Sequence, residues 1–168
     1  MSSKNQQSSS IVYWIIGVIT VVVVLIIVFL ASKSSTSSKT NREVALTCTT
    51  DMATQFHIHP NLKIMINGQK QEIPTNIGVK TNCMNSLHTH DNSGVIHVES
   101  PEKRDFTLAD FFAVWNKAYN KNQILDYKVD DNHLISQTVN GIEVQDYEST
   151  ILRDNDKIVI YYYGEIRE

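Results

Sequence analysis

The stretch IHPNLKIMINGQKQEI, residues 58–73, decides the fold. Isoleucine and leucine recur at even spacing over 58–66, which is the period of a strand with one buried face. The Asn67-Gly68 dipeptide that follows favours a two-residue β-hairpin, because a type I′ turn needs a positive φ at both central positions. The return strand is predicted over 69–73 and ends before Pro74, since proline cannot donate a hydrogen bond to a neighbouring strand. The sequence therefore predicts a β-hairpin.

A second Asn-Gly pair predicts another hairpin near the end of the chain. Asn140-Gly141 joins segment 134–139 to segment 142–147, and the same turn chemistry applies. A last strand is predicted over 157–163, after an Asp-Asn-Asp turn. The ending L-x-D-x-D-x-I-x-I, residues 152–160, resembles the last strands of β-grasp domains. That resemblance implies a fold and says nothing about activity.

One amphipathic helix is expected between the hairpins. Thr107 is a good N-cap, and Asp110 three residues later approximates a capping box. Phe106 and Phe111 are spaced as a hydrophobic staple around this cap. Strands, then a helix, then strands predict an α+β domain, with an antiparallel sheet and one main covering helix. The apolar face of that helix is predicted to comprise Leu108, Phe111, Phe112, Trp115 and Tyr119.

An apolar segment at residues 11–30, IVYWIIGVITVVVVLIIVFL, contains no charge and no proline. At 1.5 Å per residue its length matches a hydrocarbon core of roughly 30 Å. Tyr13 and Trp14 lie near one end, where aromatic side chains favour the membrane interface. A cleaved signal peptide would have a shorter apolar region and a better cleavage site than Ala31-Ser32-Lys33. We therefore expect a single transmembrane helix over 11–31 that attaches the chain to the membrane.

The rest of the chain divides into a tail, a linker and a domain. Residues 1–10 are a short polar tail, and the serine-rich segment 32–43 reads as a solvated linker. The domain is expected over 44–168. All 18 acidic residues of the chain lie from Glu43 onward, against 11 of its 15 basic residues, so this part carries a net charge of −7. Such a charge argues against a nucleic-acid partner, which needs a basic face.

Histidine is concentrated in one part of the sequence. Five of the six histidines lie within 41 residues. On a strand, residues two apart share a face, so both histidines of the first motif lie opposite the apolar face of the predicted first strand. The three motifs are His57-Ile58-His59, His88-Thr89-His90-Asp91 and His97-Val98-Glu99.

The second and third motifs are predicted to pair across a turn at 91–94. This register places His88 opposite His97 and His90 opposite Val95, so that the three histidines share one face with Glu99. Directly opposed side chains approach to about 4.5–5.5 Å between Cβ atoms, which is close enough to share a metal ion.

This pattern predicts a transition-metal site built on imidazole. Neutral imidazole is the commonest metal ligand in proteins, and copper and zinc are the ions we expect. No phosphate-cradling loop is recognisable, so no nucleotide cofactor is expected. The core ligands are predicted to be His88, His90 and His97. His57 and His59, on an adjacent strand, are expected to be further ligands or a second site. Asp91 and Glu99 either complete the coordination sphere or orient the imidazoles.

Other functions fit parts of the pattern. A histidine cluster can also bind carbohydrate, or act as a pH switch because close imidazoles repel once protonated. The domain can instead be a structural or interaction module, such as an accessory subunit of a membrane complex with membrane-protein partners. A metal-dependent enzyme is a third alternative. The cupin pattern and the motifs H-E-x-x-H, G-x-S-x-G and C-x-x-C are absent from the sequence, which favours binding over catalysis.

Several stretches resemble a known group of proteins. The motifs LHTHD at 87–91 and IHVESP at 96–101, with segments 57–78, 106–116 and 139–164, are similar to a family of small secreted or membrane-anchored prokaryotic proteins. The asparagine-, lysine- and isoleucine-rich composition resembles that of archaeal members. No activity is established for that family, so the resemblance implies location and fold. Ala109 departs from the family, whose members often have glycine there, and an early helix position tolerates either.

The orientation of the chain follows from opposing signals. Lys4 is the only basic residue before the apolar segment and three basic residues follow it in the linker, which favours a cytoplasmic domain. Cys48 and Cys83 suit a disulfide in an oxidising compartment, although two unrelated thiols are the alternative. The cysteine pair, the serine-rich linker and the family resemblance favour the other side. We expect a single-pass protein of the cell membrane with its C-terminal domain outside the cytoplasm.

Overall fold

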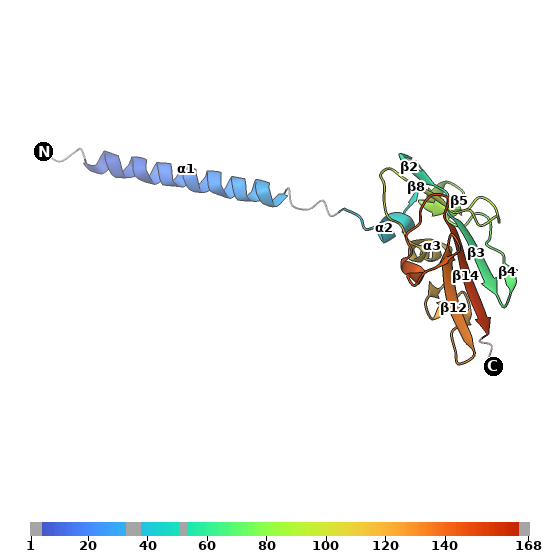
Figure 1. Ribbon diagram of the computed structural model, residues 1–168. Helices are drawn as coiled ribbons and strands as arrows, with labels where there is room; N and C mark the ends of the chain where they lie inside the picture. Colours follow the sequence, from blue (N-terminus) through green and yellow to red (C-terminus); the bar gives the residue numbers. More distant parts are fainter. Residues whose placement is uncertain (1–4, 33–37, 51–53, 165–168) are drawn as a thin grey trace. The chain divides into compact units, whose positions relative to one another are not determined.

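The computed structural model describes residues 5–32, 38–50 and 54–164 of the chain. Two compact units divide at Ser38. The first contains helix α1 (Asn5–Ser32) (Figure 1). Its stretch Ile11–Phe29 has a mean hydropathy of 3.2, and none of it is buried within the protein. By length and composition this helix is apolar enough to cross a membrane.

A five-stranded sheet forms the centre of the second unit. Its strand order is β13-β12-β14-β3-β4, and Figure 1 shows the four longer strands side by side. The central pair β14 and β3 runs parallel, whereas the other neighbours are antiparallel. Parallel neighbours need a long crossover, and the chain between the two hairpins supplies it. The strands are β3 (Asn61–Ile66), β4 (Gln69–Gln71), β12 (His133–Val139), β13 (Ile142–Glu143) and β14 (Lys157–Gly164).

Both predicted hairpins are confirmed. Asn67 and Gly68 have φ values of 50° and 80°, and Asn140 and Gly141 have 54° and 83°, as the type I′ turn requires. The predicted first strand is wrong in one respect. It is interrupted after residue 58, and the chain resumes at β3 in a different sheet. Pro60 lies in this break, where its missing N–H removes a ladder hydrogen bond.

Helix α3 (Leu108–Trp115) covers part of the core. The backbone N–H and the hydroxyl of Thr107 both donate to Asp110 Oδ2, at 3.0 and 3.1 Å, which fixes the predicted start of the helix. The helix ends at Asn116, which has the left-handed φ of 57° typical of a helix stop. Tyr119 was expected on this helix but lies beyond it on a strand. Its ring still packs on Phe112, with centroids 4.9 Å apart.

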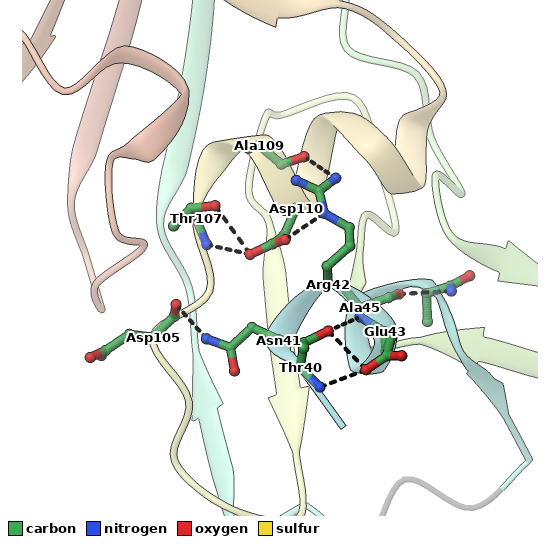
Figure 2. Close-up of polar contacts among 10 residues, drawn as sticks. Thr40, Asn41, Arg42, Glu43, Ala45, Asp105, Thr107, Ala109 and Asp110 are labelled. Carbon is green, nitrogen blue, oxygen red and sulfur yellow. Dashed lines mark hydrogen bonds and ion pairs between the residues drawn. The ribbon is translucent and has the colours of Figure 1, made fainter. Parts of the chain in front are cut away.

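A short helix, α2 (Asn41–Leu46), starts the domain earlier than the predicted boundary at residue 44. Its capping box pairs Thr40 with Glu43. Both residues were predicted to belong to the linker. Arg42 reaches from α2 to α3, where Nε lies 2.9 Å from Asp110 Oδ1 and a terminal nitrogen donates to the Ala109 carbonyl at 2.7 Å (Figure 2). These contacts dock α2 on the domain.

Three small sheets and one short 3₁₀ helix, η1 (Tyr147–Ser149), complete the described fold. One sheet has the order β1-β6-β5, one β11-β10-β9, and the third β2-β8-β7. The class is α+β, as expected, but the described residues form four sheets where one was predicted. The strands are β1 (Cys48–Thr49), β2 (Phe56–Ile58), β5 (Val79–Lys80), β6 (Cys83–Asn85), β7 (Leu87–His88), β8 (His97–Ser100), β9 (Tyr119–Asn120), β10 (Gln123–Ile124) and β11 (Tyr127–Lys128).

One hydrophobic core joins these elements. The buried residues of β3, β14 and α3 belong to a single cluster, which also includes residues from the sheet β2-β8-β7. The third sheet is therefore held rigidly against the main one. The members that matter here are Leu62, Ile64, Ile158, Ile160, Phe111, Phe112, Ile58, Leu87 and Val98.

Candidate metal centre

The sheet β2-β8-β7 has apolar side chains on one face and histidine and glutamate side chains on the other. In the middle row, Val98 of β8 pairs with Ile58 on one side and Leu87 on the other, and all three are buried in the core. The rows on either side pair His88 with His97 and His57 with Glu99. Because successive residues of a strand point to opposite faces, these polar side chains lie on the face away from the core.

The predicted pairing of His88 with His97 is confirmed, but it extends no further into the turn. The backbone N–H of Thr89 donates to the Ile77 carbonyl, and Val95 forms a bridge with Asn61 of β3 instead of facing His90. The loop between β7 and β8 thus pairs with neighbouring segments of the chain and not with itself.

Gly94 explains why this loop lies so close to β3. Its carbonyl accepts a hydrogen bond from the Leu62 N–H at 2.8 Å. It has a φ of 92°, and a Cβ placed there would lie 2.2 Å from the Leu62 carbonyl oxygen. Only glycine fits this approach.

The histidines form two groups of three that can hold a metal ion. His57 and His59 group with His97, and so do His88 and His90. In each group one potential ligand atom per residue lies within 4.8 Å of the others. The centroid of the His97 ring is 4.5–5.7 Å from the centroids of the other four rings. His97 is therefore the residue that the two groups share.

The buried His88 is held in the tautomer that a metal ligand needs. Its side chain is fully buried, and Nδ1 lies 3.0 Å from the backbone carbonyl of Asn85. A carbonyl only accepts, so Nδ1 carries the hydrogen and Nε2 keeps its lone pair in the neutral ring. Nε2 lies 3.2 Å from Nε2 of His90. Burial, the largest effect, lowers the pKa of His88, which favours this neutral form.

The pKa of His97 is also depressed. Burial, followed by repulsion from the four neighbouring imidazoles, lowers it from 6.5 to about 4. The ring is consequently neutral at pH 7, and a nitrogen lone pair is available to a metal ion. Its Nδ1 lies 3.5 Å from Nε2 of His57.

Glu99 lies between the two groups. One carboxylate oxygen, Oε1, is 3.1 Å from Nε2 of His57 and 3.9 Å from Nε2 of His88. Its side chain is 14% exposed, whereas those of His57 and His59 are each 42% exposed. The centre thus has a buried side at His88 and an open side through which an ion can enter.

Asp154 adds a carboxylate that sequence reasoning missed. It follows in the chain 95 residues after His59, whose backbone N–H donates to Oδ1 at 2.9 Å. The ring Nδ1 of His59 lies 3.9 Å from the same oxygen. From the sequence, this aspartate was predicted only as part of a turn, and no local pattern links the two positions.

Asp91 lies outside both groups of the described ligand atoms. Its carboxylate accepts a hydrogen bond from the Ser93 N–H at 2.8 Å. The Ser93 side chain, followed by its backbone N–H, lowers the pKa of Asp91 through hydrogen bonds to the carboxylate. The carboxylate shapes the loop beside the centre. His133 lies apart from the cluster, with Nδ1 2.9 Å from Asp130 and its ring stacked on Tyr162.

Cys48 and Cys83 form a disulfide in the structure, with Cα atoms 5.4 Å apart. It links β1 to β6, the strand that contains Asn85. The Asn85 side chain donates to the Ala45 carbonyl of α2 at 2.9 Å, and its own carbonyl holds His88. The disulfide and α2 therefore support the backbone that orients a candidate ligand.

Comparison with protein-family models, curated proteins and solved structures finds no match to this chain. The resemblance to small membrane-anchored prokaryotic proteins stays a prediction.

Proposed function

We propose that this chain is a single-pass membrane protein whose domain lies outside the cytoplasm and binds a transition metal, copper or zinc. The observation that carries the proposal is the pair of three-histidine groups that share His97. Three imidazoles with ligand atoms this close need only small movements to reach the 2.0–2.1 Å bond lengths of zinc. The domain serves to bind or deliver the ion, with catalysis the less favoured alternative.

The surroundings of the histidines support this proposal. The Asn85 carbonyl fixes the tautomer of His88 at 3.0 Å, as outer-shell carbonyls do for histidine ligands in known metal sites. The depressed pKa of His97 keeps that ligand unprotonated at neutral pH. Carboxylates of Glu99 and Asp154 approach the rings and offset the charge of a bound cation.

Two further features support the location and the fold. The stretch Ile11–Phe29 is long and apolar enough for a membrane anchor, and the disulfide between Cys48 and Cys83 suits an oxidising compartment. In the main sheet, two hairpins flank a helix in the sequence, and the first and last strands of the sheet along the chain, β3 and β14, run parallel at its centre. This arrangement supports a β-grasp-like domain.

Metal analysis tests the function. The full chain, purified in detergent and dialysed against Zn²⁺ or Cu²⁺ and then against buffer, is expected to retain bound metal. A variant with His88→Ala and His90→Ala should retain less. His133→Ala is the matched control, because this histidine lies outside both groups. Equal metal contents in the double variant and the wild type would refute the proposal. Co-purification of the chain with a fixed set of membrane proteins, without bound metal, would instead favour an accessory subunit.

Chemical labelling tests the location. Intact cells are treated with a membrane-impermeant reductant and then with a membrane-impermeant thiol reagent. Cys48 and Cys83 should become labelled, because both lie in the domain proposed to face outward. Labelling that requires cell lysis would place the domain in the cytoplasm.

A further inference from the structure

The arrangement of the five histidines carries an inference about how many ions they hold. The geometry points to a binuclear metal centre, in which one ion binds at His57 and His59, a second binds at His88 and His90, and His97 and Glu99 lie between the two. This inference rests on the proposed metal-binding function.

Bond lengths argue against a single ion bound by all five rings. Two nitrogens bonded to one ion at about 2.1 Å can be at most about 4.2 Å apart. Within each group of three, the potential ligand atoms lie within 4.8 Å of one another, which is close to this maximum. The five residues form two such groups and not one. His57 and His59 come from β2 and the residue after it, whereas His88 and His90 come from β7 and the loop that follows. They flank β8 on opposite sides.

The residues between the two pairs have the chemistry of bridging ligands. His97 has two ring nitrogens, one of which carries a hydrogen in the neutral ring. It would therefore bridge two ions as an imidazolate, after binding of the second ion releases that proton to solvent. Its ring lies 4.7 Å from that of His59 and 4.5 Å from that of His90, between centroids. Glu99 Oε1 faces one ring of each pair, at 3.1 Å from His57 and 3.9 Å from His88. A carboxylate can bind two ions through its two oxygens. Each ion would then have four protein ligands, the usual number for zinc.

Each pair of histidines also has a further carboxylate nearby. Asp154 lies 3.9 Å from the His59 ring nitrogen. Asp91 directly follows His90 in the sequence, on the side of the other pair. With Glu99 between the pairs, three carboxylates lie near the histidines, and they would offset much of the charge of two divalent cations.

The number of bound ions and their magnetic coupling test the inference. The full chain in detergent is stripped with a chelator and loaded with Cu²⁺, and copper is counted per chain. Two ions are expected. Bridged Cu²⁺ ions couple their unpaired electrons, so the ordinary electron paramagnetic resonance signal per copper should be strongly reduced in the wild type.

A variant with His57→Ala and His59→Ala separates the two positions. Both side chains are 42% exposed, so their removal leaves the core intact, and near-UV circular dichroism verifies the fold. This variant should bind one Cu²⁺ and give a full uncoupled signal. His90→Ala, which removes an exposed ligand and retains the buried His88, should weaken only the other position. His133→Ala should behave as the wild type.

The other results each have a distinct meaning. One ion in the wild type with reduced binding in the variants would overturn the binuclear centre and leave the metal-binding function standing. Two ions with full, uncoupled signals would show independent sites and overturn the shared ligands. No retained copper or zinc in any protein would contradict both proposals.

Discussion

Removal of the disulfide between Cys48 and Cys83 should strongly destabilise the domain. The two cysteines are 35 residues apart in the sequence. A cross-link over a loop of this length lowers the entropy of the unfolded chain enough to stabilise the fold by roughly 3.8 kcal/mol at 25 °C. The enclosed segment includes β3, a central strand of the main sheet, so the cross-link restricts a part of the chain that contributes to the core. Both half-buried side chains are small, so replacement with serine adds little loss of packing.

Chemical denaturation of the full chain in detergent measures this effect. In a Trp14→Phe background, Trp115 is the only tryptophan, and its fluorescence reports on α3 and the core that it contacts. The variant with Cys48→Ser and Cys83→Ser should lose about 3–4 kcal/mol of unfolding free energy. At roughly 3 °C per kcal/mol for a domain of this size, its thermal midpoint should fall by about 10 °C.

Reductant provides the matched control. It should lower the stability of the wild type to that of the serine variant and leave the serine variant unchanged. A loss below about 1 kcal/mol would refute the reasoning, because the unfolded chain would then already be as compact without the cross-link. A loss caused by the serine substitutions but not by reductant would assign the effect to packing instead of loop closure.

Three further changes have expected outcomes. Arg42→Ala should lower the unfolding free energy, measured in urea, by about 1 kcal/mol, since this arginine is 41% exposed and Asp110 keeps two hydrogen bonds from Thr107; no change would contradict the docking role of α2. Gly94→Ala should cost about 2–4 kcal/mol, because its Cβ would clash with the Leu62 carbonyl; a stability equal to the wild type would refute that clash. Without metal, stability should fall as the pH drops from about 6.5 toward 4, since the folded state resists protonation of His97; His97→Gln should flatten this dependence in a pH series of urea midpoints, and an unchanged slope would contradict the assignment.

Local chemistry accounts for the parts of the fold that could be predicted. The two Asn-Gly turns and the Thr107 cap each depend on a few adjacent residues, and all three are present in the structure. The order of the strands depends on contacts across the whole chain, so the parallel pairing of β3 with β14 was not foreseen. Helix α2 had a local signal in its capping box, but its serine-rich neighbourhood led to its assignment as linker.

The candidate site shows the same division between local and distant information. The pairing of His88 with His97 followed from the alternation of side chains around one turn. An adjacent strand was expected to hold His57 and His59. The register that pairs His57 with Glu99 was not foreseen, because it requires β2 to join the edge of β8 opposite β7. Asp154 reaches His59 from 95 residues away, and nothing in either segment encodes that contact.

The same strand, β8, explains how the domain can present ligands without depending on a metal to fold. Val98 pairs with Ile58 and Leu87, and all three belong to the apolar core. His97 and Glu99 precede and follow Val98 in the sequence, so their side chains point away from that core. The row of apolar side chains persists whether or not an ion is bound, unlike small zinc modules in which the metal replaces a core. If the proposed ion binds, the histidines would already be positioned for it, and little of the binding free energy would be spent on ordering them. For the same reason, alanine at an exposed ligand such as His57 tests metal binding without also testing the stability of the fold.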